Sequence, residues 1–534
     1  MKKQAILLVE NTDNLFVLAQ FLVHDGWEII SAGNTASFLK NSNIPVTIDK
    51  SFTTGINSNT NYLKYVYNII KNFKNTNSFN QEEITPIDLV CININPTVYN
   101  VKDFSETENP DNSIDIKTVS LIRVAAKNYS NVIILTDPND YEETINQLKV
   151  GEVVPEYRLY LAGKALNLTS AYDAAAGASI LYQGAQIEFP NWFLIPYQHL
   201  AKIKQGDNAQ QQCHLYSMGE SKCALNGVKK LQGPEIDFEV ISNCFTSWKI
   251  ITQFIKVVKE PFSVQSTDCN GYPFTTQFTP QTGSVLFLGV KNNNPISAAF
   301  GSNATEAFWK AYNADQSSYE KAILACSSVI DENTAAEIIK LNIKAIVAPD
   351  YTKEAKEVLS QNHGIYVFMA SKLISDYPEF MSIDGGLISK QRDLNFFRKL
   401  NVVTQTRPTQ IQMDAMLMGM LISLFAKSDS SIIVNDFTTI GVSCAQVNKA
   451  RSLQYAMENA KQIFDNHLTS NDRSAEILVS DSVIHFDERA RMLADLGVKA
   501  IIQTGGDATD GEFIDFCNEH GISMVFTGIK HLAF

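Results

Sequence analysis

The chain has 534 residues, of which 45% are hydrophobic and 19% are charged, and its formal net charge is −13. A chain of this length is expected to form two to four domains, and its composition is typical of globular proteins. The excess of acidic residues argues against nucleic acid or an anionic membrane as a partner, because both are negatively charged. A local basic pocket for a phosphorylated metabolite is still compatible with this charge.

The eight cysteines are scattered, and no two of them have CxxC spacing. This pattern favours reduced thiols in a cytoplasmic protein and predicts no metal site. His485, His520 and His531 also lack the spacing of zinc ligands. The apolar run at residues 5–9 is cut short by Glu10, so it predicts neither a signal peptide nor a membrane span.

The first third of the chain alternates apolar strands with helical segments. Strands are predicted at residues 6–9, 28–31, 88–94 and 132–136, and helices at residues 15–24 and 159–181. This alternation is typical of an open α/β domain. A break in the pattern at Pro190 predicts a boundary there, so that residues 1–190 form the first domain.

The second region, residues 191–534, continues the same alternation. Residues 261–284 are rich in Thr, Gln, Pro and Gly and predict an insertion loop. Further strands are predicted at residues 285–290, 345–348, 365–369, 432–434, 476–480, 500–503 and 523–526. The methionine-rich run at residues 413–420 predicts a buried helix. The whole chain therefore belongs to the α/β class.

The C-terminal stretch carries the clearest motif. The apolar run at residues 500–503 stops at Gly505 and Gly506, a helical phase follows, and a second apolar run leads to Lys530 and His531. A strand, a glycine-rich turn, a helix and a strand form one layer of a parallel sheet, where ligands gather at the carboxyl ends of strands.

Several motifs occur in an order that resembles one known family. They are TPIDLV at residues 85–90, RVAAKN at 123–128, GDN at 206–208, VKNNNP at 290–295, DGGL at 384–387, QRD at 391–393, RPT at 407–409 and the C-terminal stretch. Together they resemble the purine-biosynthesis bienzyme that joins AICAR transformylase to IMP cyclohydrolase. The similarity extends along nearly the whole chain.

The resemblance implies a fold and an activity. The expected fold is an open parallel-sheet domain like that of methylglyoxal synthase, followed by a transformylase half of two deaminase-like α/β units. The expected reactions are formyl transfer from 10-formyltetrahydrofolate to AICAR and ring closure of formyl-AICAR to IMP. The family works as a homodimer, its partners are a nucleotide and a folate, and it requires no metal for catalysis.

For the cyclohydrolase site, the resemblance implies Asp115 and Lys127 as catalytic residues. It implies substrate binding by Ser31, Gly33, Thr35 and Asn128. The sequence also departs from the family: the loop at residues 61–68 lacks the family's Arg, His and Pro, and Asn95 replaces its catalytic Tyr. An alternative interpretation is therefore that Asp115, Lys127 and Asn128 only support the fold.

For the transformylase site, the family's Val-Lys-His-Ala-Asn-Pro motif reads Val-Lys-Asn-Asn-Asn-Pro here. Lys291 and Asn294 are kept, whereas Asn292 replaces the His. An amide forms hydrogen bonds but does not exchange a proton near neutral pH, so the general-base role is lost at this position. We nevertheless assign Lys291, Asn292 and Asn294 to the catalytic site by resemblance.

Further residues match substrate-binding positions of the family, in several cases with a changed side chain. They are Lys204, Gly206, Asn208, Gly385, Gly386, Gln446, Lys449, Asp481, Gly505, Gly506, Lys530 and His531. Lys449 keeps the charge of a family Arg but not its bidentate fork.

Three hypotheses of function follow. The first is an enzyme that carries out both last steps of IMP synthesis. The second is a catalytically impaired paralogue that binds a purine nucleotide or folate as a regulatory or scaffold protein. The third is an enzyme with a shifted substrate. The full-length resemblance favours the first, and the substituted catalytic positions are the argument for the second.

Overall fold

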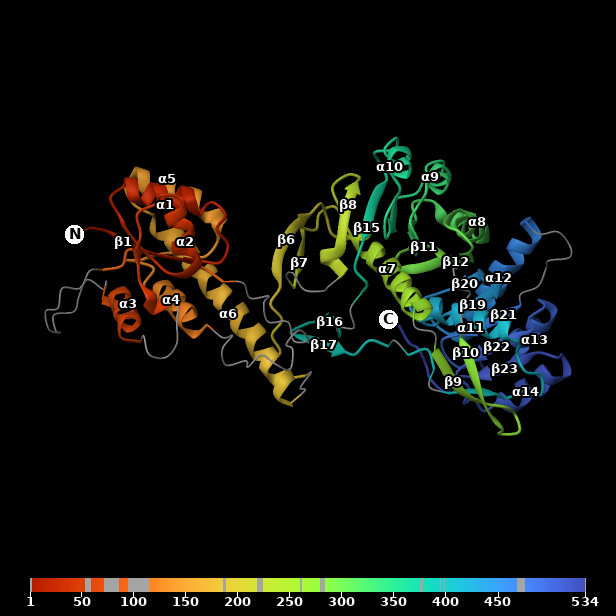
Figure 1. The fold of residues 1–534 in the computed structure, drawn as a ribbon. Coiled ribbons are helices and arrows are strands. Elements are labelled where there is room, and N and C mark those ends of the chain that lie inside the picture. Colours follow the sequence, from red (N-terminus) through yellow and green to blue (C-terminus); the bar gives the residue numbers. More distant parts are fainter. Residues whose placement is uncertain are drawn as a thin grey trace. The chain divides into compact units, whose positions relative to one another are not determined.

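The structure is a computed structural model that describes residues 2–52, 59–71, 86–94, 115–185, 189–218, 224–259, 262–278, 284–374, 378–393, 395–397, 399–467 and 476–533. It divides into two compact units (Figure 1). The first unit comprises Met1–Gln198 with Tyr216–Ser221, and the second comprises His199–Leu215 with Lys222–Phe534. Each unit is described by itself.

The first unit is built on a five-stranded sheet in the order β3-β2-β1-β4-β5, with every neighbouring pair parallel. The strands are β1 (Gln4–Val9), β2 (Glu28–Ser31), β3 (Thr47–Ile48), β4 (Leu89–Asn93) and β5 (Ile133–Leu135). The helices are α1 (Leu15–His24), α2 (Gly33–Asn41), α3 (Asn59–Lys71), α4 (Ile116–Lys127), α5 (Tyr141–Val150) and α6 (Pro155–Ala185). Short 3-10 turns lie at η1 (Lys50–Phe52) and η5 (Pro138–Asp140).

Strands β1, β2, β4 and β5 of this sheet coincide with the apolar runs of the sequence. Every residue of β4 is buried, as expected for a parallel strand covered by helices on both faces. The strand order reverses between β1 and β4, and ligands of open α/β sheets bind in the crevice at such a point.

The second unit is built on a 14-stranded mixed sheet. Its order is β10-β9-β18-β23-β22-β21-β19-β20-β12-β11-β13-β14-β15-β8. The strands are β8 (Val228–Gln232), β9 (Phe262–Thr267), β10 (Pro273–Phe278), β11 (Val285–Lys291), β12 (Asn294–Gly301), β13 (Ile323–Cys326), β14 (Ala345–Ala348), β15 (Tyr366–Ala370), β18 (Leu400–Val402), β19 (Ser431–Asn435), β20 (Thr438–Ser443), β21 (Ile477–Ser480), β22 (Ala500–Gln503) and β23 (Ser523–Phe526). Two small sheets pair β6 (Gln198–Ile203) with β7 (Cys213–Ser217), and β16 (Glu379–Ile383) with β17 (Gly386–Lys390).

The large sheet is an internal repeat. In each half an antiparallel hairpin, β11–β12 or β19–β20, is followed by three parallel strands, β13–β15 or β21–β23. An antiparallel strand, β8 or β18, ends each series. The two halves meet where β12 pairs with β20. This arrangement confirms the predicted fold class, with a parallel sheet at the N-terminus and two related α/β units after it.

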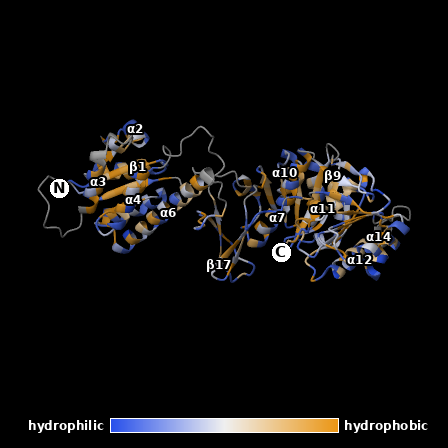
Figure 2. Cartoon of the chain, turned by 90° about the horizontal axis from the view of Figure 1, so that it is seen from below, coloured by the Kyte–Doolittle hydropathy of each residue, from blue (hydrophilic) through white to orange (hydrophobic). Residues whose placement is uncertain are grey.

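Helices cover the repeat in matching positions. They are α7 (Phe238–Lys259), α8 (Ala304–Ala314), α9 (Glu332–Ile338) and α10 (Lys353–Leu359) in the first half, and α11 (Gln410–Ser423), α12 (Lys449–His467), α13 (Glu488–Asp495) and α14 (Asp510–Glu519) in the second. Helices α7 and α11 share one core, whereas α8–α10 and α12–α14 each pack in a separate core. In Figure 2 the strands and α11 are mainly hydrophobic, and α12 and α14 carry hydrophilic residues. The predicted buried helix is α11, in which Met413, Met416, Met418 and Met420 are at most 5% exposed.

One predicted element is wrong. Residues 261–284 were expected to form an insertion loop, but residues 262–278 form the antiparallel strands β9 and β10, with β9 paired to β18. The exposed Gln265, Thr275 and Gln277 alternate with buried side chains, those of Val264, Thr276 and Phe278, which is a strand pattern. Within the described part of this segment, the turn at Asp268–Gly271 has the character of a loop, with Gly271 N donating to Asp268 O over 2.9 Å. Among the described residues, no helix is both long and apolar enough to cross a membrane.

Candidate functional site

The hairpin β11–β12 holds the three residues assigned to formyl transfer. Lys291 ends β11 and pairs with Asn294, which begins β12. Asn292 and Asn293 form the turn between them, with φ values of 53° and 59°. A two-residue hairpin turn with both φ angles positive is type I′, and asparagine adopts this backbone more readily than most residues. The asparagine run is therefore a turn sequence that presents Lys291 and Asn292 at one end of the strands.

Helix α7 anchors this turn. Asn293 N donates to Asn243 Oδ1 over 2.7 Å, and Asn293 Oδ1 accepts hydrogen bonds from Ser242 Oγ at 2.8 Å and from Thr246 Oγ1 at 3.1 Å. Lys291 Nζ donates to the backbone oxygen of Glu320 over 2.8 Å. Asn292 remains exposed. Asn293, which sequence reasoning missed, thus fixes the turn, while Asn292 faces solvent.

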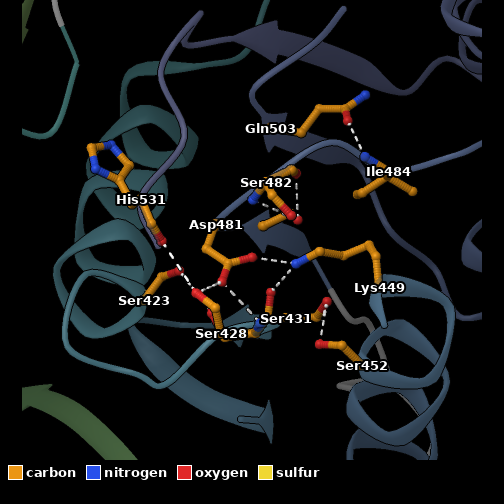
Figure 3. Close-up of polar contacts among 12 residues, drawn as sticks. Ser423, Ser428, Ser431, Lys449, Ser452, Asp481, Ser482, Ile484, Gln503 and His531 are labelled. Carbon is orange, nitrogen blue, oxygen red and sulfur yellow. Dashed lines mark hydrogen bonds and ion pairs between the residues drawn. The ribbon is translucent and has the colours of Figure 1, made fainter. Parts of the chain in front are cut away.

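A second polar cluster surrounds Asp481, which follows β21 and is fully buried (Figure 3). Its carboxylate accepts hydrogen bonds from Ser428 Oγ at 2.7 Å and from Ser430 N at 3.0 Å, and it forms an ion pair with Lys449. Lys449 Nζ also donates to Ser430 O over 2.6 Å. Burial lowers the pKa of the Lys449 ammonium, and the charge of Asp481 offsets only part of this effect. Both residues were predicted to bind substrate, and the structure shows them bound to each other.

The loop at residues 427–430 connects this cluster to the hairpin. Lys427 N donates to Asn294 Oδ1 over 3.1 Å. Asp429 and Gln446 exchange backbone hydrogen bonds of 3.0 Å and 3.2 Å. Ser428 N donates to Ala533 O over 2.8 Å. One network of hydrogen bonds thus joins Asn294 and Gln446 to Asp481, Lys449 and the C-terminal tail.

His531 holds that tail in place. It is 2% exposed, and its backbone N donates to Asp481 O over 2.9 Å. Its Nδ1 lies 2.7 Å from Asp393 Oδ2, and its Nε2 lies 2.8 Å from Phe396 O. A backbone carbonyl only accepts hydrogen bonds, and so does an ionised carboxylate, so both ring nitrogens carry a proton. Burial lowers the pKa of His531, but Asp393 and the Phe396 carbonyl outweigh it, and the net effect is a raised pKa.

We expect the stability of the protein to fall as the pH rises through the raised pKa of His531. A group whose pKa is higher in the folded state stabilises fully below its unfolded pKa of about 6.5, and this contribution disappears once the folded state loses the proton. Melting temperatures measured from pH 6 to pH 9 should fall more steeply for the wild type than for His531→Gln. The exposed His363→Gln is the control and should follow the wild type. Parallel curves for wild type and His531→Gln would contradict this role.

The glycine turn after β22 is shaped by packing. Gly505 has φ 74°, and a Cβ at this position would lie 2.4 Å from the ring of Phe526. Gly506 N donates to Asp510 Oδ2 over 2.6 Å. The amide that could hold a phosphate at the start of α14 is therefore bound by the helix's own carboxylate. Lys530, which precedes the buried His531, is exposed.

Two other sets of predicted binding residues lie on the small sheets. In the loop after β6, Gly206 N donates to Gln211 O over 3.1 Å and Asn208 N to Gln211 Oε1 over 2.9 Å, while Lys204 is exposed. Gly385, with φ 71°, and Gly386 lie at the exposed turn of β16–β17. The structure thus places both sets outside the 14-stranded sheet that carries Lys291.

In the first unit, Ser31 and Thr35 support the end of β1. Ser31 Oγ donates to Leu7 O over 2.7 Å, and Thr35 Oγ1 donates to Val9 O over 2.9 Å. Gly33 begins α2 with φ 56°. At the crevice, Asn93 Oδ1 accepts hydrogen bonds from the backbone N of Glu10 and Asn11 at 2.7 Å and 2.9 Å. Ser31 and Thr35 were expected to form the phosphate cradle, but their hydroxyls are hydrogen-bonded to the backbone of β1.

Asp115 and Lys127 are not brought together. They flank α4 at opposite ends, 12 residues apart, which corresponds to about 18 Å along a helix. Asp115 caps α4 by accepting from Thr118 N over 2.9 Å, and Asn128 Nδ2 donates to Ile69 O over 2.6 Å. The alternative of a fold-supporting role therefore fits Asp115 and Asn128. Residues 61–68 lie within helix α3, and Asn95 lies outside the described residues.

Within the described part of the chain, no group of three or more His, Cys, Asp or Glu side chains could hold a metal ion. The residues missed from the sequence are mainly Asn293, Ser430 and Asp393. An Asn-Asn pair between two apolar runs is a hairpin signal that could have identified the turn. The partners of Asp481 and His531 are distant in sequence and left no such signal.

Comparison with known proteins identifies the family. The family model described as "AICARFT/IMPCHase bienzyme" matches residues 125–459. The chain is 32% identical to the "Bifunctional purine biosynthesis protein PurH" of Clostridium acetobutylicum, over 99% of both chains. It is 31% identical to the protein of the same name from Clostridium perfringens and 30% identical to that from Brachyspira hyodysenteriae, again over 99% of both chains. The chain therefore belongs to the AICARFT/IMPCHase bienzyme family.

Proposed function

We propose that this chain catalyses the last two steps of IMP synthesis. A formyl group passes from 10-formyltetrahydrofolate to the amine of AICAR, and formyl-AICAR then closes to IMP with loss of water. The observation that carries this proposal is the match over 99% of the chain to relatives named as bifunctional purine biosynthesis proteins. We assign ring closure to residues 1–190 and formyl transfer to residues 191–534.

We propose that formyl transfer takes place at the β11–β12 turn. The amine of AICAR attacks the formyl carbon, and the carbonyl oxygen becomes an oxyanion. The Lys291 ammonium stabilises this oxyanion, and Asn294 keeps the turn attached to the loop at Lys427. Collapse of the intermediate breaks the bond between the formyl carbon and the folate nitrogen, and this nitrogen takes a proton from water. Asn292 supplies a hydrogen-bonding amide in this scheme, and the amine proton leaves to water.

We propose that ring closure takes place at the β1–β4 crevice of the first unit. The carboxamide nitrogen attacks the formyl carbon, and the oxygen of that group leaves as water. Such a reaction needs a cradle for the phosphate and a donor for the leaving oxygen. The start of α2 at Gly33 lies at the carboxyl end of β2, where a helix N-terminus favours an anion.

The test of the function is direct. Purified protein is incubated with AICAR and 10-formyltetrahydrofolate, and the products are separated by chromatography. We expect formyl-AICAR first and IMP after it. Absence of both products, together with tight AICAR binding in calorimetry, would overturn the proposal of an active enzyme. It would support the hypothesis of a catalytically impaired paralogue. That alternative is disfavoured because the full-length relatives carry the name of the bifunctional protein. We further propose that the protein is a cytoplasmic homodimer. Light scattering tests the dimer by measuring the mass of the protein in solution.

We expect Asn292→His to raise the rate of formyl transfer at least tenfold. A positioned general base contributes about 10²–10⁴-fold, and histidine is among the residues that adopt positive φ most readily, so the turn should accept it. The variant should also acquire a pH dependence near the ordinary histidine pKa of about 6.5. The matched control is Asn292→Gln, which keeps the amide and adds no base. Equal rates for the two variants would show that proton transfer does not limit the reaction.

A further inference from the structure

The internal repeat gives the β11–β12 turn a counterpart. In the second hairpin, Asn435 pairs with Thr438 as Lys291 pairs with Asn294, and Asp436 and Phe437 form the turn. The turn residues have φ values of 43° and 53°, close to the values at Asn292 and Asn293. The register of both hairpins also shifts at the same place, between the third-last and the second-last residue of the first strand. These residues are Gly289 and Val290 in β11, and Ile433 and Val434 in β19. The two turns are therefore equivalent parts of the repeat.

The two turns differ in what lies beneath them. The first turn is hydrogen-bonded to Ser242 and Thr246, the fifth and ninth residues of α7. The fifth and ninth residues of α11 are Asp414 and Met418, and together with Phe437 they line a cavity of about 450 Å³. The first turn thus lies over a closed set of hydrogen bonds, and the second turn lies over an open space. Its volume lies in the range of small-molecule sites.

The walls of this cavity are aromatic on one side. Phe300 and Phe437 stack with ring centroids 5.9 Å apart and an angle of 13° between the rings. Phe254 lies 5.1 Å from Phe300 at a tilted angle. Leu417 and Leu421 of α11 also line the space. A planar aromatic ligand would find both stacking partners and apolar contacts here.

The charged groups of the cavity are mainly acidic. Glu306, Asp414 and Asp436 carry carboxylates, and Lys310 is the basic residue in the lining, which gives a formal charge of −2. Lys310 Nζ is already held by Glu306 at 3.2 Å and by Asp436 at 3.3 Å. The net field repels a phosphate and attracts a cation, so the nucleotide substrate is a poor fit. Carboxylates beside aromatic faces suit an aromatic ring with a protonated amine or amidine edge.

We propose that the cavity beneath the β19–β20 turn is a second ligand site, distinct from the formyl-transfer site, which binds a planar aromatic cation without a phosphate group. The site arises from the duplication, because the second hairpin keeps the geometry of the first, and Phe437 of its turn faces Phe254 and Phe300 of the first half across a cavity instead of polar contacts. Binding there does not depend on turnover at the first site.

The test uses proflavine, a planar aromatic cation whose fluorescence reports binding to the full chain. We expect saturable binding that Asp414→Asn weakens at least tenfold, whereas Glu354→Gln, at an exposed position on α10, stays within twofold of the wild type. Asp436→Asn is a second variant that fits the turn, because its side chain is 78% exposed and asparagine accepts positive φ. It should also weaken binding.

Two controls identify the site. Saturating AICAR should leave proflavine bound, and the aromatic anion 8-anilinonaphthalene-1-sulfonate should bind at least tenfold more weakly than proflavine. Displacement of proflavine by AICAR would place it at the nucleotide site and overturn the proposal. Unchanged affinity in both Asp414→Asn and Asp436→Asn, with melting temperatures like that of the wild type, would overturn it as well.

Discussion

Lys291→Ala is expected to lower kcat for formyl transfer by about 10²–10³-fold, the usual effect of removing one group that stabilises an oxyanion. Lys291 ends β11 beside the turn, and among the described residues its ammonium is held in position by the backbone carbonyl of Glu320. The ammonium therefore keeps donors that can reach a substrate oxygen. Loss of the charge should act on the transition state more than on AICAR binding, so kcat should change more than KM.

The same variant provides an internal control. Ring closure, measured with formyl-AICAR supplied directly, should stay within twofold of the wild type, because we assign it to the other unit. Lys353→Ala removes a lysine with 85% of its side chain exposed and should leave both reactions unchanged. Lys291→Arg keeps the charge in a planar fork and should restore part of the rate. A formyl-transfer rate for Lys291→Ala within threefold of the wild type would exclude the proposed role.

The strands of the parallel layers could be predicted from the sequence. Residues 500–503 and 523–526 are short apolar runs with turn residues after them, and they form β22 and β23 at the predicted bounds. Such runs are fully buried, so their composition alone identifies them. The hairpin β9–β10 could not be identified in the same way. Its Gly271 and Pro273 are of residue types depleted in strands and indicate a loop, whereas pairing with β18 makes the segment a strand.

The sequence predicted only those parts of the candidate site whose residues are close together in the chain. The resemblance led to Lys291 and Asn294, and both lie at the same turn. Helical spacing alone would have separated Asp115 from Lys127, since residues 12 apart lie about 18 Å apart along a helix. The pairs Lys449 with Asp481 and Asp393 with His531 join residues 32 and 138 positions apart. Such partners are set by tertiary packing, which no pattern at fixed spacing records.

The buried pair of Lys449 and Asp481 leads to the largest expected effect on stability. Their side chains are 12% and 0% exposed, and Asp481 also accepts hydrogen bonds from Ser428 and Ser430. Asp481→Leu would leave the Lys449 ammonium buried without the carboxylate that it is paired with. Breaking a buried pair in this way costs about 3–5 kcal/mol. We expect the urea midpoint of the second unit to fall accordingly, as followed by tryptophan fluorescence, to which the buried Trp248 contributes.

The double variant Asp481→Leu with Lys449→Met separates the charge from the other contacts. Removing both charged groups restores most of the lost stability if the unpaired ammonium is the cause, because a buried ion pair and an apolar pair of similar volume differ little in free energy. Glu357→Leu, which breaks an exposed pair with Lys353, is the control and should not shift the midpoint measurably. If the double variant is as unstable as Asp481→Leu, the hydrogen bonds to Ser428 and Ser430 carry the stability instead. In that case Ser428→Ala should reproduce much of the loss of stability. Asp481 Oδ2 accepts from the Ser428 hydroxyl over 2.7 Å, and this contact holds the loop at residues 427–430, which joins the hairpin to the C-terminal tail.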